Sequence, residues 1–210
     1  MNADVKNAIK DALILLAITL IAGLALGGVH VITLEPIERQ KELAVANSCK
    51  AVFPDEEGFP HVVSFIPAED GVRDQVTSFK FDNGVSVGNL YYALDDNGNR
   101  VGSAIEVTSG EGYGGDIKLM CGVTNDGTLR GVSILEISET AGLGMKAGTV
   151  LVPQLHNISA GHITFTKTGS TSESEIDAIS GATITTTAFV NIVNAALDVS
   201  GTINPEGGAS

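Results

Sequence analysis

Two apolar segments, Leu90-Tyr-Tyr-Ala-Leu94 and Val101-Gly-Ser-Ala-Ile-Glu-Val107, flank the polar run Asp95-Asp-Asn-Gly-Asn-Arg100 and decide the fold. Tyrosine, valine and isoleucine favour extended strands, and the Asn-Gly pair between them is typical of a tight turn. The region therefore predicts a β-hairpin.

A second hairpin is predicted immediately downstream. Residues 117–124 and 129–137 are rich in β-branched and apolar side chains, and they flank Asn125-Asp-Gly127. Two consecutive hairpins imply an antiparallel sheet. Apolar residues occur at both parities of these strands, so we expect the sheet to be covered on both faces.

Helices are predicted on either side of the hairpins. Apolar residues recur at helical spacing after Thr183, and Glu35-Pro36 is typical of a helix start. That upstream helix is expected to end before Pro54. Residues 55–84 mix charge, glycine and proline, and they allow no assignment. The predicted fold class is α+β, with a mainly antiparallel sheet and packed helices.

The N-terminal region is strongly apolar, with no charged residue from Ala12 to Leu34. As a helix, this run covers the roughly 30 Å hydrocarbon core of a membrane. The alternative is a cleaved signal peptide with Lys6 and Lys10 as its basic region, although the apolar run is longer than such peptides usually have. We predict a short segment at 1–11, a transmembrane helix at 12–34, one domain at 35–199 and a flexible tail at 200–210.

Composition excludes several classes of function. The chain has 12 basic and 25 acidic residues, no tryptophan and a net charge of −13, which argues against nucleic-acid binding. Its four histidines are scattered and its two cysteines form no CxxC pair, so neither a metal site nor a catalytic triad is expected. Buried free thiols are favoured for Cys49 and Cys121 over a disulfide, because one lies on a helix face and the other on an apolar strand face.

Two glycine-rich stretches are candidate ligand loops. Gly110-Glu-Gly-Tyr-Gly-Gly115 has the spacing of a dinucleotide fingerprint, but a strand pattern follows it where that fingerprint requires a helix. We interpret it as a loop between strands whose backbone can approach a planar ligand. Glu139-Thr-Ala-Gly-Leu-Gly-Met-Lys146 exposes backbone donors and holds one leucine outward, and a plain turn is the alternative. Lys146 either balances a phosphate or is solvated.

The stretch Asp177-Ala-Ile-Ser-Gly-Ala-Thr183 ends at a loop-to-helix junction. There the hydroxyl of Thr183 is accessible, and phosphate oxygens would meet free backbone N–H groups at the positive end of a helix. The alternative is an ordinary threonine N-cap, which is a common reason for this residue at this place.

The order of these motifs resembles the membrane-anchored, FMN-binding G subunit of Rnf complexes, and more distantly the C subunit of the sodium-translocating NADH:quinone reductase. The resemblance covers nearly the whole chain. It rests on the N-terminal span, the helix end Ala51-Val-Phe-Pro54, the loop Gly112-Tyr-Gly-Gly115, the stretch Ser138-Glu-Thr-Ala-Gly-Leu-Gly144 and the stretch Ser180-Gly-Ala-Thr183.

The resemblance implies that FMN is bound covalently, with its phosphate esterified to Thr183. It also implies that Asp177 and Ser180, Gly181 and Ala182 form the recognition sequence of a flavin transferase that uses FAD as donor. The flavin pocket would then comprise Tyr113, Gly114, Glu139, Thr140, Gly142, Leu143, Gly144 and Lys146. Ala141 stands where the family usually has proline, which loosens the loop but removes no chemical group.

The function implied is that of an electron-carrying subunit of an ion-translocating ferredoxin:NAD⁺ oxidoreductase, with no catalysis of its own. Its partners would be the other membrane and peripheral subunits, and its domain would lie outside the cytoplasm, anchored to the cell membrane. Two alternatives are an FMN-carrying subunit of a sodium-translocating NADH:quinone reductase and a flavin-free, membrane-anchored assembly module.

Overall fold

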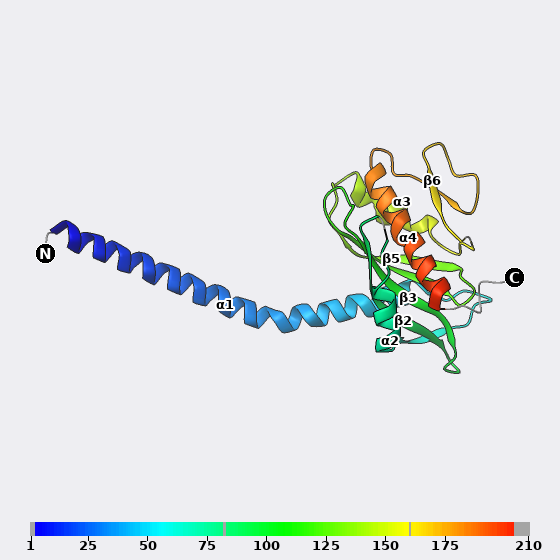
Figure 1. Ribbon diagram of the computed structural model, residues 1–210, viewed down its shortest axis with the longest axis horizontal. Coiled ribbons are helices and arrows are strands. Elements are labelled where there is room, and N and C mark those ends of the chain that lie inside the picture. Colours follow the sequence, from blue (N-terminus) through cyan, green and yellow to red (C-terminus); the bar gives the residue numbers. More distant parts are fainter. Residues whose placement is uncertain (1–2, 82, 160, 204–210) are drawn as a thin grey trace. The chain divides into compact units, whose positions relative to one another are not determined.

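The computed structural model describes residues 3–81, 83–159 and 161–203. It comprises two compact units, residues 1–44 and 45–210. Helix α1 (Ala3–Ala51) accounts for the described part of the first unit and continues into the second (Figure 1, blue to cyan). From Lys10 onward it is long and apolar enough to cross a membrane, and its most apolar stretch is unburied.

Pro36 lies inside α1, so the prediction that a new helix begins at Glu35-Pro36 is wrong. Proline has no N–H to donate to the carbonyl of Ile32, yet the helix continues through this position into the good helix formers Glu38 to Leu43. An ion pair between Arg39 Nη2 and Glu35 Oε1, 2.6 Å long, bridges the turn that contains the proline. The apolar span and the first helical turns of the globular unit are therefore one element.

The globular unit is built on a five-stranded sheet in the order β1-β2-β3-β4-β5, with every neighbouring pair antiparallel. Its strands are β1 (Val62–Pro67), β2 (Val85–Asp95), β3 (Arg100–Ser109), β4 (Ile117–Thr124) and β5 (Leu129–Ile137). Both predicted hairpins are confirmed, as is the α+β class. The stretch that allowed no assignment holds β1 and helix α2 (Asp70–Thr77).

One face of the sheet packs against helix α4 (Thr183–Ile203), drawn in orange and red in Figure 1. Fully buried Ile105 and Leu119 from the sheet share one apolar cluster with Phe189 and Val193 from α4. Burying each such side chain stabilises the fold by about 1.5–3 kcal/mol. This packing fixes the start of α4 relative to the loops at one end of the sheet.

The opposite face is covered by the end of α1 and the residues that follow it. Val52 and Phe53 are buried there against Ala104 and Met120. A Cβ at Gly122 would lie 2.4 Å from the carbonyl oxygen of Val52, so only glycine allows this close approach. The expectation that both faces are covered is confirmed.

The remaining elements connect β5 to α4. They are the 3₁₀ helix η1 (Gly144–Lys146), α3 (Ala147–Val150), the 3₁₀ helix η2 (Val152–Gln154), and the parallel pair β6 (Thr164–Thr166) and β7 (Glu175–Asp177). Helix α4 continues to Ile203, past the point where the flexible tail was predicted to begin. Val199 and Ser200 are buried, which holds this last turn in place, and the rest of the predicted tail lies outside the described residues.

Both cysteines are free and buried, as predicted. Cys121 lies in the main core, where burial raises the pKa of its thiol to about 12. The thiol is therefore neutral and unreactive at physiological pH.

Candidate functional site

A cavity of about 290 Å³ lies where three segments meet: the loop between β3 and β4, the segment after β5, and the start of α4. Its lining residues are Tyr113, Glu139, Thr140, Leu143, Gly144, Gly181, Ala182 and Thr185. All except Thr185 belong to the set predicted for the flavin site or its attachment sequence. Segments separated by up to about seventy positions along the chain are thus brought to one place by the sheet and α4.

Glu139 joins two of these segments. Its Oε1 accepts a hydrogen bond from the backbone N–H of Tyr113 at 2.8 Å. The side chain is half-buried, and its Oε2 faces the backbone of Gly144. The carboxylate therefore acts as a fixed acceptor that holds the loop of Tyr113 against the segment after β5.

Glycines allow close packing at this end of the domain. A Cβ at Gly144 would lie 2.7 Å from Glu139 Oε2 and 2.7 Å from Thr185 Oγ1. A Cβ at Gly114 would lie 2.2 Å from the carbonyl oxygen of Ser138. A side chain at Gly114 would require a backbone shift, and one at Gly144 would require the side chains of Glu139 and Thr185 to move, which explains why glycine stands at both positions.

Thr183 is the first residue of α4, directly after Gly181, which has a φ of 80°, and buried Ala182. Its side chain is half-buried, and within the described ranges its hydroxyl has no hydrogen-bond partner. Its carbonyl accepts a hydrogen bond from Thr187 Oγ1 at 2.9 Å. Because the Thr183 hydroxyl makes no capping bond, it is free for another role.

Thr183 is not itself part of the cavity lining, but Ala182 and Thr185 on either side of it are. The hydroxyl of Thr186, one residue further, is committed to the fold: it accepts from the N–H of Ile179 and donates to the carbonyl of Ala182. Thr185 is the lining residue that sequence reasoning missed. No signal in the sequence marks it, because only the packing of α4 shows that it faces the cavity.

The other predicted site residues lie outside the lining: Gly114, Gly142, Lys146, Ser180 and Asp177. Lys146 is exposed at the end of η1. The Asp177 carboxylate accepts a hydrogen bond from the N–H of Ser170 at 2.7 Å, so it has a structural contact of its own. Ser180 is exposed beside Gly181.

Exposed apolar side chains surround the cavity. Tyr113 is 71% and Leu143 is 42% exposed, and both line it. Walls that combine apolar side chains with a few polar groups are typical of sites for small organic cofactors.

Comparison with known proteins agrees with this geometry. The FMN-binding domain family matches residues 112–198, a range that contains every residue of the cavity lining. The chain thus carries an FMN-binding domain, and FMN as its cofactor class is confirmed.

Full-length relatives define the family more closely. The chain is 30% identical over 203 residues to the G subunit of the Na⁺-translocating ferredoxin:NAD⁺ oxidoreductase complex of Acetobacterium woodii, covering 95% of this chain and 94% of the relative. It is 29% identical over 198 residues to the G subunit of the ion-translocating oxidoreductase complex of Methanosarcina acetivorans, covering 93% and 96%. The chain belongs to the G-subunit family of ion-translocating oxidoreductase complexes, as its sequence motifs predicted.

Among solved structures, NqrC of Shewanella oneidensis is similar, with a TM-score of 0.44 and 18% identity over 55% of this chain and 58% of that one.

Proposed function

We propose that this subunit relays electrons within an ion-translocating ferredoxin:NAD⁺ oxidoreductase complex through FMN bound to Thr183 by a phosphoester bond. The observation that carries the proposal is the half-buried hydroxyl of Thr183 at the first residue of α4, beside the cavity, which has no hydrogen-bond partner among the described residues. Flavin accepts two electrons together and releases them singly, and the protein holds and tunes it.

Different residues of the chain would bind different parts of such a cofactor. The first turn of α4 supplies backbone N–H groups without helical partners and the positive end of the helix, both of which favour a phosphate. Tyr113 and Leu143 offer apolar surface to the ring system. Glu139 keeps the two loops together, and Gly114 lets them approach closely enough to form one wall, because a Cβ there would lie 2.2 Å from the carbonyl oxygen of Ser138.

Attachment requires a flavin transferase with FAD as donor. Thr183 Oγ attacks the phosphorus of the FMN half, the bond to AMP breaks, and AMP leaves while the hydroxyl proton passes to the transferase or to solvent. Ser180 and Gly181 are exposed and so accessible to that enzyme. Asp177 belongs to the proposed recognition sequence, and its hydrogen bond to Ser170 holds the approach to this loop in one conformation.

Helix α1 would anchor the subunit in the cell membrane, with the globular unit outside the cytoplasm and in contact with the other subunits. The support is the unburied apolar stretch of α1, which is long enough to span a bilayer.

The test is electron transfer by the assembled complex with Thr183→Ala in this subunit. We expect ferredoxin-dependent NAD⁺ reduction to be lost while the subunits still co-purify. Thr187→Ala is the matched control, because Thr187 lies one helical turn further on and its hydroxyl only bonds the carbonyl of Thr183. Activity in Thr183→Ala equal to that of Thr187→Ala would refute the relay.

A further inference from the structure

The chain makes a tight turn directly before Thr183. The N–H of Ala182 donates to the carbonyl of Ile179 at 3.0 Å, and Gly181 has a φ of 80°. A positive φ at the third residue is typical of a type II turn. Ser180 and Gly181 are exposed, whereas Ile179 and Ala182 are buried. The turn therefore presents two small residues to the outside while both of its ends lie in the core.

One buried hydroxyl, that of Thr186, connects both ends of this turn. Its Oγ1 accepts a hydrogen bond from the N–H of Ile179 at 3.2 Å and donates to the carbonyl of Ala182 at 3.0 Å. A bond to the carbonyl four residues earlier is common for threonine in a helix. The bond from Ile179 is different, because Ile179 lies outside α4 and its buried N–H needs an acceptor. The Thr186 hydroxyl therefore fastens the turn to the first turn of α4.

A second side chain holds the segment that leads into the turn. The Gln154 amide, in η2, accepts from the N–H of Asp177 at 2.7 Å and donates to the carbonyl of Asp177 at 3.2 Å. Its Nε2 also donates to the carbonyl of Val150 at 2.6 Å. One amide thus bonds both backbone groups of Asp177, as a neighbouring antiparallel strand would. The backbone of Asp177 is therefore fixed by a side chain 23 residues away along the chain.

Both contacts act on the residues between Asp177 and Thr183, and neither uses the Thr183 hydroxyl. A transferase that reads Asp177 and modifies Thr183 needs the two residues at a fixed separation. Orientation of the reacting groups supplies much of the rate of such a reaction, and a displacement of about 1 Å can slow it by about 10²-fold. Residues that fix this segment should therefore control the rate of attachment.

We propose that Gln154 and Thr186 are positioning residues for the attachment of FMN, because they hold the segment 177–182 in the conformation in which Thr183 reaches the FAD donor. The inference rests on the proposed attachment to Thr183. In that step the bond from Thr183 Oγ1 to phosphorus forms as the bond to AMP breaks, and neither positioning residue gains or loses a proton. Their contribution is geometric.

The test is the rate at which the purified full chain in detergent, produced without a transferase, acquires flavin when a flavin transferase and FAD are added. Thr186→Val keeps the branched shape and loses the hydroxyl, whereas Thr186→Ser keeps the hydroxyl and loses a methyl group. We expect attachment to be about ten-fold slower in Thr186→Val and within about two-fold of the wild type in Thr186→Ser. A role in packing alone predicts the reverse order, because serine leaves a cavity in the core.

Gln154→Met and Gln154→Glu test the second contact. Methionine has a similar length and makes none of the three hydrogen bonds, so we expect attachment to be about ten-fold slower. Glutamate keeps an acceptor for the N–H of Asp177 but loses both donated bonds, and an intermediate rate is expected. Gln154 is only half-buried, so this pair decides the question even if Thr186→Val does not fold.

Matched controls are the same changes made far from the turn. The Thr202 hydroxyl donates to the carbonyl of Asp198 at 3.1 Å near the end of α4, and Gln75 is exposed in α2. Thr202→Val and Gln75→Met should acquire flavin at the wild-type rate. Chemical denaturation of the same flavin-free proteins gives the folded fraction, and each rate is expressed per folded chain.

Two results would overturn the inference alone: attachment to Thr186→Val and Gln154→Met at the wild-type rate, or slower attachment to Thr186→Ser than to Thr186→Val. A wild-type chain that acquires no flavin would refute the proposed attachment itself, and this inference with it. The two failures are therefore distinguished by the wild type in the same experiment.

Discussion

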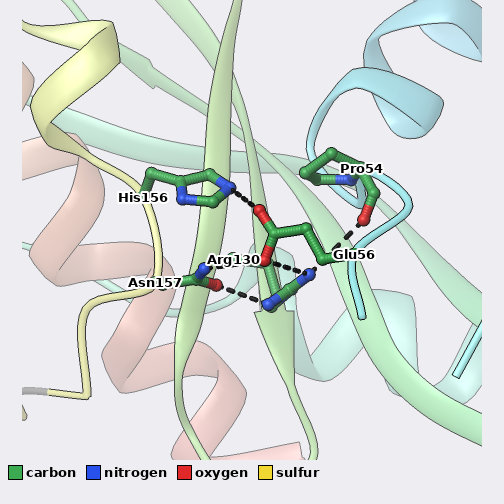
Figure 2. A network of polar contacts seen from close by, with 5 residues as sticks. All are labelled: Pro54, Glu56, Arg130, His156 and Asn157. Atoms are coloured by element: carbon green, nitrogen blue, oxygen red, sulfur yellow. Dashed lines mark hydrogen bonds and ion pairs between the residues drawn. The ribbon is translucent and has the colours of Figure 1, made fainter. Parts of the chain in front are cut away.

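The two ends of the sheet are built in opposite ways. At the cavity of Tyr113 and Thr185, glycines bring backbone against backbone, and the Thr183 hydroxyl beside it is left without a partner among the described residues. At the other end, Arg130 and Glu56 form an ion pair and share further polar contacts (Figure 2). Polar groups without a protein partner beside a cavity favour ligand binding, whereas polar groups that bond one another stabilise the fold.

The contacts of Arg130 with Glu56, Asn157 and Pro54, here called the Arg130 network, also explain how the chain after α1 is held to the sheet. Arg130 extends from β5 to Glu56 and to the carbonyl oxygen of Pro54, both in the loop that follows α1. Asn157, from the segment after η2, bonds both Arg130 and Glu56. Three parts of the chain meet at this one guanidinium. Its loss should therefore lower the free energy of unfolding and leave cofactor binding unchanged.

The largest expected effect on stability is that of Arg130→Met. Removing the buried guanidinium deletes its bonds to Glu56, Asn157 and the carbonyl of Pro54 together with its packing on the Phe59 ring, and we expect the free energy of unfolding to fall by about 3 kcal/mol. Flavin content of the folded protein should be unchanged. Chemical denaturation of the full chain in detergent measures the change, and Arg73→Met is the control, with an expected change within about 0.5 kcal/mol. Equal stability of the two variants would contradict the role given to the network.

A smaller loss of stability, combined with loss of flavin, is expected for Gly114→Ala. Its Cβ would meet the carbonyl oxygen of Ser138 at 2.2 Å, so the loop must move away from the segment after β5. Overpacking of this kind costs about 2 kcal/mol. Gly71→Ala is the control, because a Cβ at Gly71 in α2 meets open space and should stabilise the helix by up to about 1 kcal/mol. Absorbance of bound flavin in both variants reports the result; normal flavin content in Gly114→Ala would show that this backbone contact does not shape the site.

The smallest effect is a pH dependence at the other end of the sheet. The hydroxyl of Thr124 and the N–H of Thr128 hold the pKa of the Asp126 carboxyl below its ordinary value of 3.8. A carboxyl with a lowered folded-state pKa contributes stability that is full above this ordinary value and is lost as pH falls through the folded-state pKa. Wild type should therefore be slightly more stable than Asp126→Asn at neutral pH, and the difference should shrink below pH 3.8. A difference that stays constant from neutral to strongly acidic pH would exclude this electrostatic contribution.

Much of the fold could be predicted because its signals are local. The turn residues Asp95 to Arg100 and Asn125 to Gly127 give both hairpins, and apolar spacing after Thr183 gives α4. The prediction failed at Pro36, where proline often starts a helix but here lies inside α1, because good helix formers follow it and the helix continues through it. The sequence pattern predicted neither β1 nor α2, because their apolar residues are few and are interrupted by charged residues and glycine.

The candidate site could be predicted in part, because its residues lie in short glycine-bearing motifs that a resemblance can match. Thr185 was missed because only the packing of α4 shows that it faces the cavity. The Arg130 network was missed for a related reason. Its members come from a loop, a strand and a second loop, and no pattern along the chain marks long-range pairing of single charged residues.

The central claim, that Thr183 carries FMN covalently, is tested most directly by intact-protein mass and in-gel flavin fluorescence under denaturing conditions. The protein is produced together with a flavin transferase, as wild type, Thr183→Ala and Thr187→Ala. We expect the mass of FMN less water and the fluorescence to be present in the wild type and in Thr187→Ala, and both to be absent from Thr183→Ala. Wild-type protein without the added mass, or Thr183→Ala that still carries it, would contradict the claim.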